Sequence, residues 1–290
     1  MKILVTGHTG FIGSNMHHFL ENIKSTELVG YSDDTGQDIF DLNQLKKSVK
    51  DCDIVYHFAA YAKPGESIIK PVDAIEINVK GCLNVLEACR AHDVPLVYPS
   101  SCEIYGNSKK PIKEDFTINP TNPYAASKAA ADRICYSYHV SYGLDVKLVR
   151  LFNPYGPHQQ LNKIMPALYF QAVEGKPLTV FGKGEDTRDY VFIEDIVSGL
   201  WAARKLPGGE AVNLATGRET TNVEIAKLLL KLTGSKSKIS FVSYPKMFGN
   251  IKNQVGSYEK AKKMIGWTPK VNLEEGMKRT IKWLESIEKR

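Results

Sequence analysis

The chain has 290 residues, of which 43% are hydrophobic and 24% charged, and this composition excludes disordered, collagen-like and coiled-coil proteins. The 38 basic and 32 acidic residues give a net charge of +6. The lysines of the last third stand at helical spacing among acids, which predicts a solvated helix face. We therefore expect no nucleic-acid partner. Apolar runs are shorter than the roughly 18 residues of a membrane helix and a signal-peptide pattern is missing, so we expect a cytoplasmic protein without a membrane partner.

Short apolar runs alternate with longer amphipathic stretches through the first 150 residues. This alternation predicts βαβ units, and therefore an α/β fold with a doubly wound parallel sheet and helices on both faces. Glycine and proline become more frequent after residue 155, which indicates a smaller C-terminal mixed α/β domain, so we predict domains at 1–155 and 156–290. None of the five cysteines forms a Cys-x-x-Cys pair, and we predict no metal site. The predicted strands are 2–6, 27–31, 54–58, 95–99 and 146–151, and the later predicted helices are 193–205, 222–233 and 273–289.

A glycine-rich turn (TGHTGFIG) directly follows the first predicted strand. Gly7 permits a tight turn, Gly10 lets the backbone approach a pyrophosphate, and Gly13 lets the next helix pack on the sheet. The start of that helix, with Phe11 and Ile12, favours an anion. The turn therefore predicts a dinucleotide cofactor on a Rossmann-type sheet, whereas a glycine-rich turn without a ligand is the alternative.

The second predicted strand should bring an acid to the adenosine ribose of such a cofactor. Tyr31 occupies the usual place of that acid, and Asp33 or Asp34 follows it. Because no arginine lies nearby, the segment favours NAD over NADP, although Tyr31 leaves that choice open.

Tyr124 and Lys128 stand four residues apart in a predicted helix, which places them on one face. A nearby ammonium lowers the pKa of a phenol, so Tyr124 is suited to remove a hydroxyl proton while hydride leaves the same carbon for a nicotinamide. Ser101 follows a predicted strand, at the sheet edge where ligands bind in open α/β folds. An ordinary helix surface and a turn serine are the alternatives.

These segments together resemble the NAD-dependent nucleotide-sugar epimerase/dehydratase family, in the extended branch of the short-chain dehydrogenase/reductase superfamily. The resemblance implies that 1–155 is an NAD-binding Rossmann domain, that 156–290 binds a nucleotide-diphosphate sugar, most often a UDP-sugar, and that the protein is a homodimer. The matching segments are 7–13, 57–60, 78–81, 100–106, 124–128, 150–157, 188–191 and 266–269.

The resemblance also assigns binding residues. Asn153 and Arg188 would hold the nucleotide diphosphate, and Val180 lies in the segment along the uracil. A second diphosphate arginine of the family is missing; either Lys246 or Lys252 replaces it, or the nucleotide sugar is held differently. The implied cofactor-binding residues are Gly7, Gly10, Phe11, Ile12, Gly13, Asp33, Asp38, Ile39, Phe58, Ala59, Ala60, Asn78, Tyr124 and Lys128.

The two residues after Ser101 bear on the type of reaction. The resemblance implies that Tyr124 and NAD first oxidise C4 of the sugar; a dehydratase then removes the C5 proton and expels the C6 hydroxyl. The order Ser-Cys-Glu resembles a UDP-N-acetylglucosamine 5,6-dehydratase, which favours Glu103 as C5 base and Cys102 as acid. A UDP-sugar 4-epimerase of the UDP-glucose type is the close alternative. A UDP-glucuronate decarboxylase and a non-catalytic dinucleotide-binding protein are more distant ones.

Overall fold

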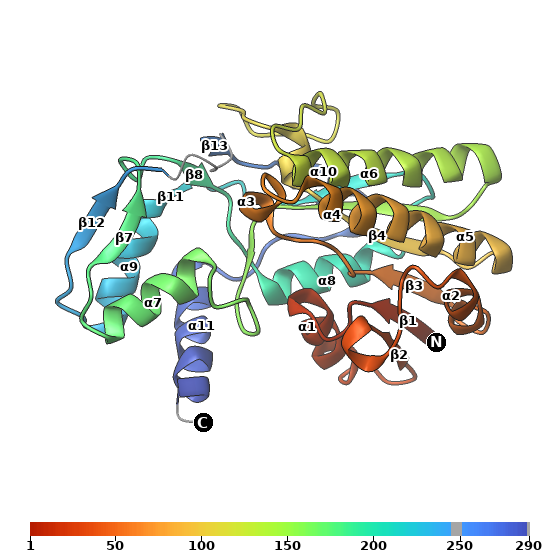
Figure 1. Ribbon diagram of the computed structural model, residues 1–290, viewed down its shortest axis with the longest axis horizontal. Helices are drawn as coiled ribbons and strands as arrows, with labels where there is room; N and C mark the ends of the chain where they lie inside the picture. Colours follow the sequence, from red (N-terminus) through yellow and green to blue (C-terminus); the bar gives the residue numbers. More distant parts are fainter. Residues whose placement is uncertain (245–250, 289–290) are drawn as a thin grey trace.

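The computed structural model describes residues 1–244 and 251–288. A six-stranded parallel sheet forms the centre, in the order β10-β5-β4-β3-β1-β2 (Figure 1). The predicted doubly wound sheet is therefore confirmed, and its order reverses between β1 and β3. The strands are β1 (Lys2–Thr6), β2 (Glu27–Tyr31), β3 (Ile54–His57), β4 (Leu96–Ser101), β5 (Val146–Leu151) and β10 (Ala211–Leu214).

Alternate side chains of the strands point to opposite faces, as the two-residue period of a strand requires. Val5 and Val97 pack in one hydrophobic cluster, under α1 (Phe11–Leu20) and α8 (Ile193–Ala203). Leu4, Leu96 and Tyr98 pack in a second cluster, under a layer of three helices. That layer consists of α2 (Leu42–Val49), α5 (Cys82–His92) and α6 (Pro123–Tyr142). Short helical segments complete this half of the chain: η1 (Asp33–Thr35), α3 (Pro64–Ser67), α4 (Pro71–Ile75), the π-helix η2 (Glu76–Gly81) and η3 (Cys102–Tyr105).

The later part of the chain adds short strands and four further helices. β10 comes from this part, yet it pairs with β5 in the main sheet. The first hydrophobic cluster continues without a break from β1 to α9. The boundary between 155 and 156 thus stays a prediction. The elements are β6 (Pro154–Tyr155) with β9 (Val191–Phe192), β7 (Leu178–Phe181) with β12 (Ile239–Val242), and β8 (Thr187–Arg188) between β11 (Thr220–Thr221) and β13 (Asn253–Gln254); the helices are α7 (Ile164–Val173), α9 (Asn222–Thr233), α10 (Glu259–Ile265) and α11 (Leu273–Glu288).

All five predicted strands exist, and their ends differ from the predictions by at most two residues. β4 runs beyond Pro99 because Ser100 and Ser101 still pair with β5, opposite Arg150 and Leu151. The strand therefore delivers Ser101 to the carboxyl edge of the sheet, directly before η3.

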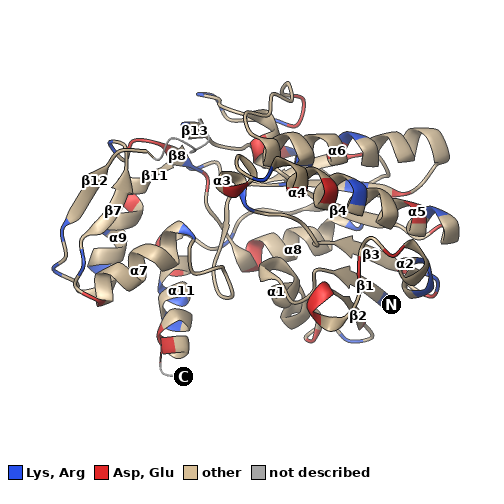
Figure 2. Cartoon of the chain, viewed as in Figure 1, with Lys and Arg blue, Asp and Glu red and all other residues tan. Residues whose placement is uncertain are grey.

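Charged residues of both signs lie side by side on the outer helices (Figure 2). On α11, Glu274 pairs with Lys231 and Lys278, and Glu275 pairs with Arg279. Of the lysines of the last third, Lys231 and Lys260 thus pair with acids, as the helical spacing predicted. In the two described ranges, none of the helices has the length and apolar character needed to cross a membrane.

Candidate active site

The glycine turn and the segment after β3 meet where the strand order reverses, which is the usual ligand position in such sheets. Gly7 has φ +67°, and a Cβ there would lie 2.6 Å from the backbone nitrogen of Ala59. The amide of Phe58 donates to the carbonyl of Thr6 at 2.9 Å. The two predicted cofactor segments, 7–13 and 58–60, are therefore in direct contact.

The start of α1 is open to an anion. Gly10 is its N-cap and supplies no side-chain cap, so the first turn has amides without a capping side chain. A Cβ at Gly13 would lie 2.2 Å from the carbonyl oxygen of Gly7, so the helix can approach the turn this closely through a glycine. The cradle formed by residues 7–13, with Phe11 and Ile12 at the helix start, fits a pyrophosphate.

The ribose side differs from the usual arrangement. Tyr31 is buried, and its phenol donates to the carbonyl of Asp38 and to Gln44. Asp34 accepts a hydrogen bond from Thr9 of the glycine turn at 3.0 Å. Asp33, at the start of η1, is exposed like Asp34, and its carboxylate accepts from the Asp34 amide at 3.1 Å.

Asn78, Asp38 and Ile39 hold the surroundings of the cofactor segments in place. The Asn78 amide exchanges two hydrogen bonds with the backbone of Tyr61 and donates to the hydroxyl of Ser127. It therefore links the segment after Ala60 to α6. The carboxylate of Asp38 accepts a hydrogen bond from the backbone amide of Phe40. The carbonyl of Ile39 accepts one from the side chain of Asn84 in α5.

Tyr124 and Lys128 lie in the first turns of α6. The side chain of Asn122 accepts from the amide of Ala125 at 2.8 Å and so caps the helix. The ammonium of Lys128 donates to the carbonyl of Pro99 at 2.7 Å and lies 4.3 Å from the centre of the Tyr98 ring. The predicted one-face arrangement therefore places Lys128 at the end of β4.

The electrostatics of the pair differ from our expectation that Lys128 lowers the pKa of Tyr124. Burial, followed by the charge of Glu103, raises the pKa of the Tyr124 phenol; a hydrogen bond with Ser101 acts in the opposite direction. Burial lowers the pKa of Lys128 to about 8. Lys128 does not lower the pKa of Tyr124 here because the phenol and the ammonium are both desolvated, and because the ammonium points at the carbonyl of Pro99.

Glu103 is a desolvated carboxylate beside the phenol. Burial raises its pKa, while a 2.9 Å hydrogen bond from the Asn122 amide and the charges of Arg188 and Lys163 lower it. Asn122 thus fixes both the start of α6 and the carboxylate, so Glu103 and Tyr124 share one anchor.

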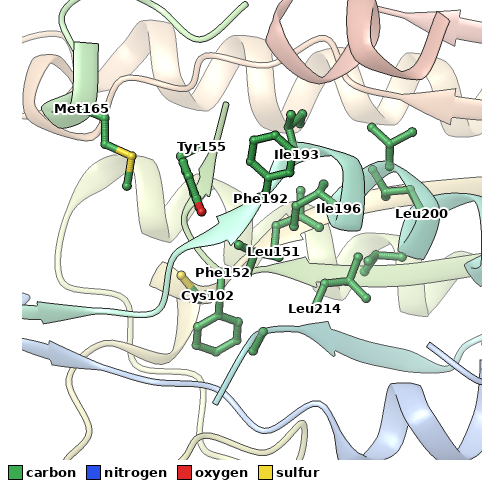
Figure 3. Close-up of a cluster of buried hydrophobic side chains, with 14 of the residues drawn as sticks. Cys102, Leu151, Phe152, Tyr155, Met165, Phe192, Ile193, Ile196, Leu200 and Leu214 are labelled. Carbon is green, nitrogen blue, oxygen red and sulfur yellow. The ribbon is translucent and has the colours of Figure 1, made fainter. Parts of the chain in front are cut away.

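Cys102 lies among the buried side chains of the first cluster (Figure 3). Its thiol donates to the Gln254 side chain at 3.1 Å, and the Asn153 amide lies 4.0 Å from the sulfur. Burial, with the charge of Glu103, raises the pKa of the thiol. The thiol is therefore a weaker acid than an unperturbed cysteine side chain.

The three predicted substrate residues differ in their surroundings. Asn153 follows β5 and donates to the carbonyl of Asp189. The guanidinium of Arg188 donates to the carbonyls of Thr187 and Ile251, which hold it near Glu103. The side chain of Val180 is buried in the core, and its predicted place along the uracil stays a prediction. Of the two replacement lysines, Lys246 lies outside the described residues and Lys252 is exposed.

Sequence reasoning missed three residues that build the site. Asn122 precedes a proline at the start of α6, and this capping pattern was a usable signal. Asp189 is fully buried and accepts from the amides of Thr216, Gly217 and Gly256. Gln254 binds Cys102 across 152 residues of sequence, so no local pattern reveals it.

The chain is similar to known proteins over nearly its whole length. A family profile described as the NAD dependent epimerase/dehydratase family matches residues 3–215. UDP-glucuronate 4-epimerase of Thermodesulfobacterium geofontis (strain OPF15) is 33% identical, over 98% of this chain and 97% of that protein. dTDP-glucose 4,6-dehydratase of Streptomyces antibioticus is 32% identical, over 98% and 92% respectively. The crystal structure of UDP-glucuronic acid 4-epimerase from Bacillus cereus, in complex with UDP-glucuronic acid and NAD, has a TM-score of 0.92 at 28% identity and covers 99% of this chain and 100% of that one.

Proposed function

The chain belongs to the NAD dependent epimerase/dehydratase family, and on that premise we propose that it is a nucleotide-sugar dehydratase acting on a UDP-sugar. The observation that carries the proposal is the half-buried, desolvated Glu103 carboxylate beside the Tyr124 phenol, with both anchored by Asn122. A 4-epimerase needs one proton acceptor at C4, whereas a dehydratase needs a second one at C5. Glu103 supplies that second acceptor.

NAD is the cofactor of this family, and when bound it accepts and returns a hydride. The cradle at 7–13, the segment 58–60 and Asp33 would hold it, with Asn78 keeping the second segment in place. We assign residues 1–155 to this task and 156–290 to the nucleotide sugar. The homodimer and the cytoplasmic location stay predictions.

The residues divide the proton transfers between them. Tyr124 takes the proton of the C4 hydroxyl, and Ser101 hydrogen-bonds the same oxygen. Lys128, fixed by the carbonyl of Pro99, supplies a positive charge on the same helix face. Glu103 then takes the C5 proton, and the C6 hydroxyl leaves as water with the proton that Tyr124 took from the C4 hydroxyl. The hydride held by the nicotinamide and the proton held by Glu103 would then return to the sugar, so the net loss is one water. Asn153 and Arg188 hold the diphosphate, since a guanidinium suits phosphate oxygens.

A UDP-sugar 4-epimerase is the second candidate, and the environment of Cys102 favours it. A dehydratase needs an acid for the departing hydroxyl, and the thiol is buried, bound to Gln254 and weakly acidic. The epimerase needs no acid at that position.

The test incubates the protein and NAD with a panel of UDP-, dTDP- and GDP-sugars and weighs the products. Loss of one water supports the dehydratase. A product of unchanged mass but inverted C4 configuration supports the epimerase and defeats the first proposal. Glu103→Gln should stop water loss while C4 oxidation, seen as reduced nicotinamide, continues. Glu224→Gln, which alters the exposed cap of α9 and an exposed ion pair with Arg218, is the matched control.

A further inference from the structure

A buried charged network connects the two elements that carry the proposed bases. Asp132 lies on α6, four residues after Lys128 and eight after Tyr124, so all three share one helix face. Arg150 of β5 holds the Asp132 carboxylate with two hydrogen bonds, of 3.1 and 3.2 Å. Asp132 is fully buried and Arg150 is 3% exposed.

The same guanidinium reaches the turn that carries Glu103. Its Nη1 donates to the hydroxyl of Tyr105 at 2.7 Å, and Tyr105 is the last residue of η3. The Tyr105 hydroxyl in turn donates to Asn213 of β10 at 2.9 Å. One planar, rigid side chain therefore joins α6 to η3.

Stability alone is a poor explanation for such a pair. Burying two opposite charges costs so much desolvation that well-packed apolar residues often serve the fold equally well or better. What an arginine fork adds is geometry, because its donors have fixed directions. Here those directions fix η3 relative to α6, and thus Glu103 relative to Tyr124.

We infer that Arg150 is a positioning residue, which acts through the Tyr105 hydroxyl to hold Glu103 at the working distance from the sugar bound at Tyr124. This inference rests on the proposed role of Glu103 in the step after C4 oxidation. Removing the hydroxyl of Tyr105 releases η3 from the network but leaves the Asp132–Arg150 pair intact.

The test is Tyr105→Phe, compared with Tyr155→Phe. Tyr155 is equally buried, and its hydroxyl makes a 3.4 Å bond to the carbonyl of Leu273. We expect Tyr105→Phe to keep the rate of C4 oxidation and the substrate KM within about twofold, and to slow the following step by about tenfold or more, so that reduced nicotinamide accumulates. Tyr155→Phe should change neither rate.

Two results would overturn the inference: unchanged rates, or equal slowing of both steps, which is what a merely structural role produces. The proposed function is tested separately on the wild type, by whether water is lost. If the enzyme is an epimerase, the step after C4 oxidation does not use Glu103, Tyr105→Phe behaves like the wild type, and the inference falls with it.

A second measurement uses a cavity of about 460 Å³ that Arg150 lines together with Arg133 and Glu114. In Arg150→Ala, added methylguanidine can occupy the vacated space. We expect it to restore water loss by about tenfold without changing C4 oxidation. Arg150→Lys, which fills that space, should not respond. If methylguanidine accelerates both variants or neither, the guanidinium fork is not the positioning group; if Arg150→Ala does not fold, Tyr105→Phe decides.

Discussion

Replacing Lys128 by methionine separates the electrostatic cost of this lysine from its role in catalysis. Methionine keeps an unbranched side chain of similar length but removes the charge. Burial lowers the pKa of Lys128 from 10.5 to about 8. This difference corresponds to about 3 kcal/mol by which the fold disfavours the ammonium relative to the unfolded chain.

The sign follows from proton linkage. Below pH 8 both the folded and the unfolded chain hold the Lys128 proton, and above pH 10.5 neither does. Between these values the unfolded chain binds more protons, so the wild type gains stability as pH rises. The stability of Lys128→Met minus that of the wild type should therefore fall by about 3 kcal/mol across this window.

The assay is urea unfolding of both proteins at pH 7 and pH 10.5. Groups that titrate alike in both proteins cancel in the difference. The change in the hydrogen bond to Pro99 when the ammonium loses its proton is already contained in the folded-state pKa of Lys128. Lys227→Met, on the exposed face of α9, gives the baseline for removing a solvated charge. The reasoning is refuted if the stability of Lys128→Met minus that of the wild type is the same at both pH values. It is also refuted if this stability difference changes with pH by the same amount as it does for Lys227→Met.

The remaining predictions concern the reaction. Tyr124→Phe should abolish turnover and leave NAD affinity within about twofold, measured by titration. Gly7→Ala should weaken NAD binding by about tenfold or more, because a Cβ there meets backbone at 2.6 Å, whereas Gly36→Ala, also at positive φ but with open space around it, should not. Cys102→Ala should leave water loss within about tenfold of the wild type, since a buried thiol of raised pKa donates a proton poorly; mass spectrometry of the product checks this.

The main sheet was predictable because each of its first five strands is a short, mostly apolar run that alternates with amphipathic helices. β5 matches its predicted range, 146–151, in full. β10 was not predicted, since its partner β5 lies far away in sequence. The two-residue strands β8 and β11 are also too short to leave a periodic pattern.

The site was predictable where chemistry depends on local spacing. The glycine turn and the four-residue interval between Tyr124 and Lys128 are such cases. The direction of a side chain was not predictable. Tyr31 ends the predicted strand β2, but its side chain turns into the protein, toward Asp38 and Gln44. Burial set the pKa values, and burial depends on contacts across the chain, such as that between Cys102 and Gln254.

Burial acts on two adjacent residues with opposite consequences, and this contrast bears on the type of reaction. It raises the pKa of both Glu103 and Cys102. For the carboxyl group, a higher pKa lies nearer to neutral pH, which makes the carboxylate a stronger base while it stays available. For the thiol, a higher pKa lies further from neutral pH, which makes the thiol a poorer acid. The turn η3 is therefore built for removing a proton, and a proton for a departing hydroxyl has to come from elsewhere in the site. In the proposed dehydratase reaction Tyr124 would supply this proton, because it would hold the C4 proton after the first step and is hydrogen-bonded to Ser101 at the start of the same turn.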